Sequence, residues 1–345
     1  MTKRKNKKTK RLKVLVTGGT GFVGFHTVLA LYEAGHEVRL LVRSQEKMRR
    51  VFEPFGLDGL ESVTGDITDA DSVEKALTGC NAVVHAAAMV SVHASDSDQV
   101  LKNNKRGTEL VLGGAWEQGI ERMVQVSSTT ALFRPGSSSV DEESPLGAAR
   151  SGYGRSKIEC DRYIRRLQSQ GAPIYTTYPG SVIGPNDPGL SEALAGIKVF
   201  LDSRLIFETS SGIQLIDARD LGRAHVLLLE RGGPPDRFLV GGQYFSWPQY
   251  GDLLARVTGE KFFRLPAPKF AMQLLGRAGD FVNNFIALDM PVTREAISYA
   301  TEWAVADDSH IKLELGIEYR DIDETLADTI RWMQQAGHLR HEYQL

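Results

Sequence analysis

Cysteine, net charge and long apolar runs are all scarce in this sequence of 345 residues. The only cysteines, Cys80 and Cys160, stand far apart and outside any recognisable spacing, so we expect a reducing cytosol, no disulfide and no bound metal. No stretch approaches the roughly 18 apolar residues of a membrane-spanning helix, and residues 14–16 are too few for the apolar core of a signal peptide. A net charge of −2 argues against nucleic acid as a partner. The chain is therefore predicted to be cytoplasmic, with no transmembrane segment.

Positive charge is concentrated at the start of the chain, in residues 1–13. We interpret residues 1–12 as a disordered, solvated basic tail, which is the usual behaviour of such a charge run. The alternative is attraction to an anionic surface, which leaves open a peripheral contact between the tail and a membrane. No internal repeat and no further low-complexity segment follow the tail.

Three glycines form the strongest motif, in the stretch KVLVTGGTGFVG of residues 13–24. An apolar run precedes them and an apolar, periodic segment follows and stops at Gly35, so the order is strand, tight turn, helix. Gly18 allows a sharp exit from the strand, Gly21 lets backbone N–H groups approach a pyrophosphate, and Gly24 lets the helix pack closely. The turn is therefore predicted to bind a dinucleotide at the helix N-terminus. The expected contacts are Gly18, Thr20, Gly21, Phe22, Val23 and Gly24.

The second expected strand, residues 36–42, is followed directly by Arg43. An acidic residue here would bind the adenosine 2′-hydroxyl of NAD, whereas an arginine accommodates the 2′-phosphate of NADP. A guanidinium presents a planar fork of donors that suits a phosphate, and Lys47 follows nearby. NADP(H) is therefore the favoured cofactor, with Arg43 and Lys47 as contacts. NAD(H) is the alternative, and Arg43 would then be a solvated surface residue.

Apolar runs alternate with helical patterns through the first half of the chain, which predicts an α/β fold of Rossmann type with a doubly wound parallel sheet. The later runs cover residues 60–63, 82–85, 122–126 and 174–178. Because sites in such sheets form at the carboxyl ends of strands, further cofactor contacts are expected at Asp66, Ile67, Ala86, Ala87 and Ala88. Asp66 could also form a local turn or cap the helix of residues 71–77. We interpret His85 as a packed core residue.

Candidate catalytic residues follow the strand of residues 122–126, which leads to Ser128. Tyr153 and Lys157 open the next helix, and residues four apart on a helix share one face. Reducing a carbonyl requires a proton for its oxygen, and a lysine ammonium can pull the pKa of a tyrosine from about 10 towards neutrality. Ser128 would donate a hydrogen bond to the carbonyl oxygen as charge develops there. Asn104 begins another helical pattern, which ends near Gly119.

The alternation of strands and helices breaks down in the last third of the chain. We predict a nucleotide-binding Rossmann domain over residues 13–184, completed by parts of 213–245, and a smaller, mainly helical substrate domain over 185–345. The later helices are expected at residues 221–230, 247–258, 293–300 and 323–336. Residues 266–288 are apolar and punctuated by proline. Packing on the sheet is favoured for them over a substrate pocket or a membrane contact.

The ordered motifs resemble those of the extended short-chain dehydrogenase/reductase family, of the NAD-dependent epimerase/dehydratase type, and most closely its dihydroflavonol-reductase-like and 3β-hydroxysteroid-dehydrogenase-like members. The motifs are TGGTGFVG (17–24), GDITD (65–69), VHAAA (84–88), NKRGT (104–108), VSS (126–128), YGRSK (153–157), YPGSVIGP (178–185) and DARD (217–220). The resemblance implies catalytic roles for Ser128, Tyr153 and Lys157, and cofactor contacts at Asn104, Tyr153, Lys157, Tyr178, Pro179 and Val182. The family often has arginine where this chain has Tyr178. A homodimer through the helices after Gly107 and Tyr153 is also implied.

Two reactions are compatible with this resemblance. The favoured hypothesis is an NADP(H)-dependent oxidoreductase acting on the ketone, aldehyde or alcohol group of a small-to-medium, fairly apolar small-molecule substrate. The alternative is an NAD-dependent nucleotide-sugar epimerase with no net redox change. Dehydratases of the family usually have an acidic pair where this chain has Thr129 and Thr130, and epimerases often have an asparagine near Gly180. A non-catalytic nucleotide sensor is disfavoured because Tyr153 and Lys157 are both present.

Overall fold

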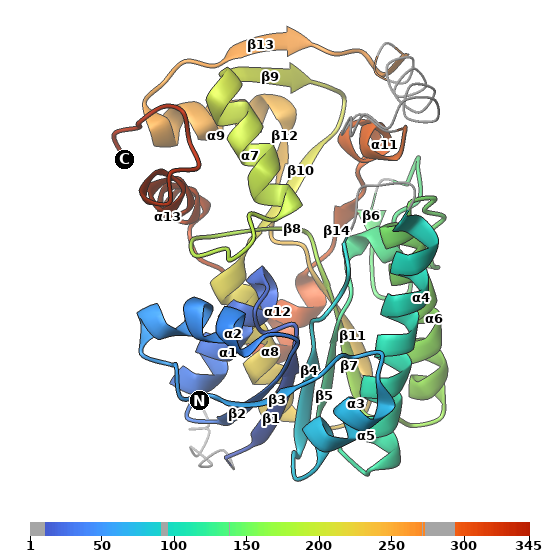
Figure 1. Ribbon diagram of the computed structural model, residues 1–345. Helices are drawn as coiled ribbons and strands as arrows, with labels where there is room; N and C mark the ends of the chain where they lie inside the picture. Colours follow the sequence, from blue (N-terminus) through green and yellow to red (C-terminus); the bar gives the residue numbers. More distant parts are fainter. Residues whose placement is uncertain (1–10, 91–95, 138, 271, 273–293) are drawn as a thin grey trace, which may run out of the picture.

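The structure is a computed structural model that describes residues 11–90, 96–137, 139–270, 272 and 294–345. Figure 1 shows a lower part built on a large sheet and an upper part built on smaller sheets and helices. In the described ranges, no helix is both long and apolar enough to cross a bilayer. The predicted tail, apart from its last two residues, and most of the apolar segment 266–288 lie outside the described residues.

A seven-stranded parallel sheet forms the lower part, in the order β11-β7-β5-β4-β1-β2-β3. Its strands are β1 (Lys13–Thr17), β2 (Glu37–Val42), β3 (Glu61–Thr64), β4 (Ala82–His85), β5 (Met123–Val126), β7 (Ile174–Pro179) and β11 (Asp236–Val240). The order reverses between β1 and β4, which is where ligands bind in doubly wound sheets. The predicted Rossmann-type sheet is confirmed.

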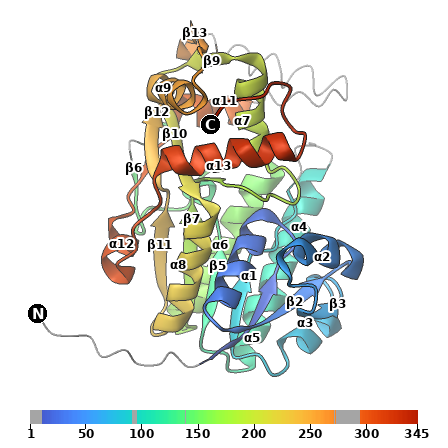
Figure 2. The ribbon, with the colours of Figure 1, turned by 90° about the vertical axis from the view of Figure 1, so that its left-hand side faces the viewer.

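Helices cover both faces of this sheet because its central strands are apolar on both sides. In β1, Val14 and Val16 pack into one core, and Leu15 packs into the other. The first face, seen in Figure 2, carries α1 (Phe22–Glu33), α2 (Gln45–Phe52), α8 (Ala218–Arg231) and α12 (Ser309–Leu315). The second carries α3 (Ala70–Leu77), α4 (Ser97–Thr108), α5 (Gly114–Glu117) and α6 (Gly152–Ser169). Short helical turns are η1 (Glu53–Phe55), η3 (Glu109–Gly113) and η4 (Thr129–Ala131).

The upper part packs two small sheets and several helices around a core of its own. The sheets are β12-β10-β8, from Gln243–Ser246, Gly212–Asp217 and Ser181–Ile183, and β13-β9, from Phe263–Pro266 and Leu205–Glu208. The helices are α7 (Glu192–Ser203), α9 (Trp247–Thr258), α11 (Arg294–Glu302) and α13 (Ile322–Gln335). A short pair, β6 (Ser139–Val140) and β14 (Val305–Ala306), completes the structure.

The structure differs from the sequence-based expectations in three places. β8 lies within the range predicted for the Rossmann domain, 13–184, but it pairs with β10 in the upper part, whereas β11, from within 213–245, joins the large sheet. β7 ends at Pro179, and the next strand along the chain, β8, pairs with β10 instead of joining the large sheet. α4 begins at Ser97 rather than at Asn104, because its first turn is polar and gives no apolar period. β6 lies between Ser128 and Tyr153, where no strand was predicted.

Candidate active site

The predicted site residues gather at one edge of the large sheet. Because the strands are parallel, their carboxyl ends lie along the same edge, and the upper part of the molecule lies above it (Figure 1). Five predicted positions fall within two residues of a strand end. These are Gly18 after β1, Arg43 after β2, Asp66 after β3, Ala86 after β4 and Ser128 after β5.

At two of the three motif positions the backbone comes so close to other backbone atoms that only glycine fits. Gly18 has a φ of 74°, and a Cβ on it would lie 2.6 Å from the backbone nitrogen of Ala87. A Cβ on Gly24 would lie 2.1 Å from the carbonyl oxygen of Gly18. Gly21 is different, because its Cβ would meet nothing closer than 3.4 Å and the residue is exposed at the start of α1. The turn therefore fits a dinucleotide pyrophosphate, with Gly21 on the open side.

The side chains of the same turn are unequally accessible. Thr20 and Val23 are half-buried, so a ligand can reach both. Phe22 is buried in the upper core, where its ring packs edge-on to His26 with 5.3 Å between ring centroids. A cofactor contact of Phe22 would therefore involve its backbone rather than its ring.

The residues expected at the adenosine lie at the surface. Arg43 and Lys47 are exposed, and within the described part of the chain neither forms an ion pair. Asp66 is half-buried, and its Oδ1 accepts hydrogen bonds from the Thr68 backbone N–H at 2.9 Å and from the Thr68 hydroxyl at 2.8 Å. Asp66 thus forms the local turn, while Asp69 caps α3. A cofactor contact through the second oxygen of Asp66 stays a prediction.

Asn104 holds the loop that follows β4. Its side chain is almost fully buried: Oδ1 accepts from the backbone N–H of Met89 at 2.7 Å, and Nδ2 donates to the Met89 carbonyl and to the Ser156 hydroxyl, both at 2.9 Å. Beside this loop, Ile67 and residues 86–88 are half-buried. Asn104 therefore joins the end of β4 to α6, which makes it a positioning residue.

Lys157 ties the start of α6 to the end of β5. Ser151 caps α6, and one turn later the Nζ of Lys157 donates a hydrogen bond to the carbonyl oxygen of Val126 at 2.9 Å. The same Nζ lies 5.6 Å from the centroid of the Tyr153 ring. Lys157 is nearly buried, whereas Tyr153 and Ser128 are half-buried and keep surface that a ligand can reach. The three predicted catalytic residues therefore lie near the carboxyl end of β5: Lys157 contacts Val126 and Tyr153, and Ser128 follows Val126 by two residues.

Tyr178 corrects the predicted set of cofactor contacts. It is 0% exposed, and its hydroxyl donates to Asp161 at 2.8 Å. Burial raises the pKa of Tyr178 well above its usual range, and Arg165 pairs with the same carboxylate. The side chain belongs to a buried polar cluster behind the site, so it cannot touch a cofactor in this conformation. Pro179 is also buried, whereas Val182 is half-buried.

Several features of the site were not predicted from the sequence. Thr17 is the last residue of β1, and its Oγ1 accepts a hydrogen bond from the backbone N–H of Ala87 at 3.4 Å. The ring of Phe133 packs against Tyr299, with 4.7 Å between centroids, and stacks on Trp303 at 5.7 Å. The aromatic cluster of Phe133, Tyr299 and Trp303 joins the loop after Ser128 to the end of α11. Tyr299 and Trp303 stand four residues apart across the end of α11, and this spacing is a signal that could have indicated their contact.

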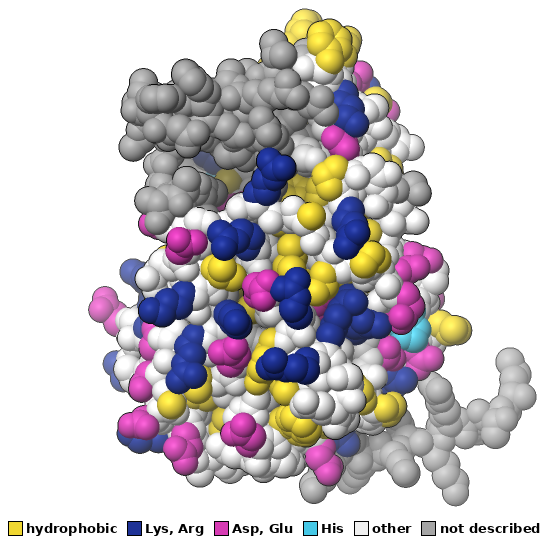
Figure 3. All heavy atoms as spheres, turned by 90° about the vertical axis from the view of Figure 1, so that its right-hand side faces the viewer, with side chains coloured by type: hydrophobic (Ala, Val, Ile, Leu, Met, Phe, Trp, Pro, Cys, Tyr) yellow, Lys and Arg dark blue, Asp and Glu magenta, His cyan; other side chains and the backbone are white. Residues whose placement is uncertain are grey.

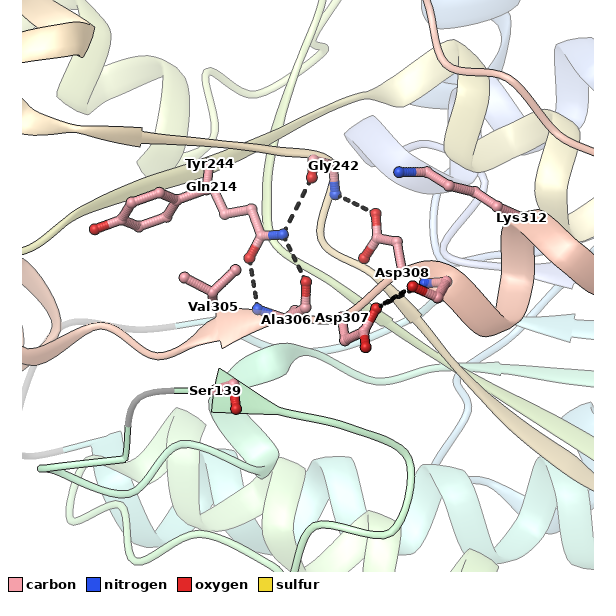
Figure 4. Close-up of a pocket in the computed structure, with 10 residues that line it drawn as sticks. Ser139, Gln214, Gly242, Tyr244, Val305, Ala306, Asp307, Asp308 and Lys312 are labelled. Carbon is pink, nitrogen blue, oxygen red and sulfur yellow. Dashed lines mark hydrogen bonds between the residues drawn. The ribbon is translucent and has the colours of Figure 1, made fainter.

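A cavity of about 280 Å³ opens between β10, β12 and β14, and Figure 4 shows its lining. Nε2 of Gln214 donates to the carbonyl oxygens of Gly242, at 3.1 Å, and Ala306, at 2.9 Å, while its Oε1 accepts from the Ala306 N–H at 2.8 Å. Asp308 accepts from the N–H groups of Gly241 and Gly242, both at 2.7 Å. The hydrogen-bonding groups of Gln214 and Asp308 are satisfied by backbone groups, so these two side chains hold the turn after β11 in place.

Three of the buried histidines in the lower part of the molecule, His26, His85 and His225, have a lowered pKa. Burial lowers the pKa of His85 and His225 to about 3 and that of His26 to about 4. Nδ1 of His85 lies 2.8 Å from the Thr17 hydroxyl, and its Nε2 lies 3.2 Å from the Thr108 hydroxyl. His85 is therefore a core residue, as the sequence indicated.

Acid is expected to destabilise the protein through these histidines. Their folded pKa values lie below the value of about 6.5 in the unfolded chain, so protons bind the unfolded chain first and stability is lost as the pH falls below about 6.5. Each histidine should cost up to about 2 kcal/mol at pH 5. Urea unfolding at pH 7 and pH 5 measures the loss. Replacing His225 with glutamine should lower the number of protons taken up on unfolding by nearly one, so the free energy of unfolding should vary less steeply with pH. An unchanged slope of unfolding free energy against pH would contradict this account.

Comparison with known proteins gives a consistent result. The sequence matches the model of the NAD dependent epimerase/dehydratase family over residues 14–241. It is 30% identical over 339 residues to the "Putative dihydroflavonol 4-reductase" of Synechocystis sp., covering 94% of this chain and 95% of that protein. It is 27% identical over 356 residues to the UDP-glucose 4-epimerase of Bacillus subtilis, covering 93% and 96%. The fold is similar to that of the UDP-glucose-4-epimerase from Stenotrophomonas maltophila with bound NAD, at a TM-score of 0.75 and 21% identity, covering 95% of this chain and 99% of that one.

Proposed function

Because the chain belongs to the NAD-dependent epimerase/dehydratase family, we propose that it is an NADP(H)-dependent oxidoreductase. It reduces a ketone or aldehyde, or oxidises the corresponding alcohol, of a small-to-medium, apolar substrate. The observation that carries the proposal is the attachment of Lys157 to the end of β5, which holds an ammonium beside Tyr153 and close to Ser128. Such an arrangement suits the movement of a proton at a carbonyl oxygen.

In this mechanism the residues of the chain handle the proton, and a bound nicotinamide would supply or accept the hydride. Tyr153 gives its phenolic proton to the oxygen of the substrate. The ammonium of Lys157 stabilises the negative charge that remains on the phenol oxygen. Ser128 accepts from the Thr130 N–H at 3.2 Å through its Oγ, which leaves its own hydrogen free to bond the substrate oxygen. In the oxidative direction each transfer is reversed.

Gly180 supports the oxidoreductase over the epimerase. A Cβ on Gly180 would lie 2.6 Å from the carbonyl oxygen of Gly241 and 3.0 Å from that of Gln214. The asparagine expected of epimerases near this position would therefore require a shift of the backbone. Thr129, where an acid is expected of dehydratases, is buried and donates to the Pro179 carbonyl at 3.1 Å. The epimerase stays the alternative, because the Bacillus subtilis enzyme aligns with 93% of this chain.

The aromatic cluster supports an apolar substrate. Phe133 follows Ser128 in the same loop, and its ring contacts Tyr299 and Trp303 from the upper part. Phe133 is itself buried, whereas Tyr299 and Trp303 are half-buried, so the apolar surface that the cluster can offer a ligand comes from these two rings. We therefore place the non-reacting portion of the substrate towards this side of the site.

Arg43 is expected to select NADPH. Replacing Arg43 with alanine should weaken NADPH binding by about tenfold to 100-fold and leave NADH binding nearly unchanged, because a charge-assisted bond to the 2′-phosphate contributes roughly 1.5–3 kcal/mol. Fluorescence titrations of both nucleotides measure the two affinities. Arg50→Ala, an equally exposed change on α2, is the matched control and should alter neither. Equal weakening of NADPH and NADH by Arg43→Ala would show that Arg43 does not select the cofactor.

We further propose that the protein is a cytoplasmic homodimer that forms through α4 and α6. These helices pack so closely that a Cβ on Gly152 would lie 2.5 Å from the Cα of Ser97. Figure 3 shows the face on which they lie, where apolar side chains are interspersed among Lys and Arg. Cys80 and Cys160 are free and buried, and burial raises the pKa of both thiols, which suits a reducing compartment. Light scattering should give twice the mass of the chain.

The released nucleotide tests the proposed reaction. The purified protein is denatured, the nucleotide is identified, and the native protein is titrated with NADPH and NADH. A freely exchanging site that prefers NADPH would support the oxidoreductase. Tightly held NAD, freed only on denaturation and accompanied by conversion of UDP-glucose into its 4-epimer, would replace this proposal with the epimerase.

A further inference from the structure

Strands β9 and β13 present an apolar face to the outside of the upper part. They pair in parallel, with Phe263 beside Leu205 and Leu265 beside Phe207. Because side chains alternate between the two faces of a sheet, these four point to the same side. Ile206 points to the other side and is buried in the upper core. On the outward side Phe263 is 66% exposed, Phe207 44% and Leu265 37%.

This arrangement reverses the usual pattern, in which the solvent side of a sheet is polar. Phe270, which follows β13 in the chain, is also exposed, at 74%. If each aromatic side chain has an area of roughly 200 Å², the three phenylalanines leave about 370 Å² of apolar surface in contact with water. The largest apolar patch on a typical monomer has an area of about 300–600 Å² and is often functional, so a surface of this size is a candidate interaction site. Apolar side chains are visible at the top of the molecule in Figure 3.

We propose that the outward face of Leu205, Phe207, Phe263 and Leu265 binds the surface of a lipid bilayer. A stable dimer needs about 800 Å² from each partner, roughly twice what is exposed here. A bilayer surface requires only that a few apolar side chains enter the boundary between headgroups and acyl chains. The four outward positions carry no charge.

The lysines around β13 suit the headgroups of a bilayer. Lys261 and Lys269 lie before and after the strand, and both are exposed. Lys269 pairs with Glu302 at 3.3 Å, whereas Lys261 has no ion pair within the described part of the chain. A lysine at the rim of an apolar surface can extend its ammonium to phosphate groups while its stem stays among the apolar side chains.

This face is far from the first described strand of the chain. Figure 1 shows β9 and β13 at the top of the molecule and β1 at the bottom. A membrane contact through β9 and β13 is therefore a different contact from one through residues 1–12. It also does not depend on which reaction the enzyme catalyses, so the two proposals can fail independently.

Sedimentation with vesicles of phosphatidylcholine and phosphatidylglycerol tests the proposal. The double variant Phe207→Ser with Phe263→Ser should lower the vesicle-bound fraction at least about tenfold, because it removes the two most exposed rings of the sheet. Leu313→Ser is the matched control, since Leu313 is 82% exposed on α12, away from this face. It should sediment as the wild-type protein does. A chain without residues 1–10 should still bind at high salt.

Circular dichroism and nucleotide binding establish that each variant folds. The proposal is overturned if the wild-type protein does not sediment with vesicles, or if the double variant sediments equally well. It is also overturned if binding disappears on removal of residues 1–10. A loss of oligomer mass in the double variant, without a change in vesicle binding, would assign the face to self-association instead.

Discussion

Replacing Tyr153 with phenylalanine is expected to lower kcat by about 10³-fold, because it removes the proton that the substrate oxygen must receive. The ring would stay in place, with Lys157 still anchored to the Val126 carbonyl. Nucleotide affinity should therefore change little. Turnover of the carbonyl substrate and nucleotide titration, measured on the same preparation, separate the two effects.

Tyr163→Phe provides the control for this change. Tyr163 lies on the same helix and is also half-buried, so the variant loses the same oxygen from the same secondary structure. Its kcat should be unchanged. Full activity in Tyr153→Phe would eliminate the proposed mechanism. An equal loss in both variants would point to the folding of α6 rather than to chemistry.

Gly24→Ala is expected to weaken nucleotide binding by at least about 100-fold and to lower the free energy of unfolding by about 1–3 kcal/mol. The added Cβ would lie 2.1 Å from the Gly18 carbonyl oxygen, so the turn would have to open. The backbone of Gly18 cannot easily move away from the new Cβ, because it already lies against the backbone of Ala87. NADPH titration and urea unfolding measure the two losses.

Two other glycines serve as controls for Gly24. Gly21→Ala meets no atom within 3.4 Å, so stability should be kept while nucleotide binding falls, because the new methyl group faces the expected pyrophosphate. Gly59→Ala meets nothing within 4 Å and should change neither quantity. Normal nucleotide binding by Gly24→Ala would contradict the assignment of this turn to the dinucleotide.

The sequence predicts an element best where local chemistry defines both of its ends. α9 begins and ends at the expected residues, because Ser246 caps it with the help of Gln249 and Gly259 ends it with a φ of 69°. β4 also matches residues 82–85, since its residues are buried on both faces and flanked by a turn. The site residues at the carboxyl ends of the strands could be predicted for the same reason, because their positions depend only on where each strand ends.

Features that depend on distant contacts could not be predicted in this way. Tyr178 is withdrawn from the site by Asp161, which α6 brings to it from elsewhere in the chain. β10 reads as an apolar strand in sequence, but its partners β8 and β12 come from segments on either side of it. Nothing in the periodicity of a strand specifies which sheet it will join. The role of Asn104 likewise depends on Met89 and Ser156, which only the fold places beside it.

The connectivity of the large sheet affects how the protein is synthesised. Its edge strand β11 and its covering helices α8 and α12 come from residues that follow β8, α7 and β10. α8 packs so tightly on α1 that a Cβ on Gly222 would lie 2.7 Å from the His26 carbonyl oxygen. A nascent chain therefore leaves α1 uncovered and the edge of β7 unpaired until the ribosome has translated well into the upper part. The lower core is complete in sequence only at Ile317, after most of the upper part, and the upper core still awaits α13, so both cores close late in translation.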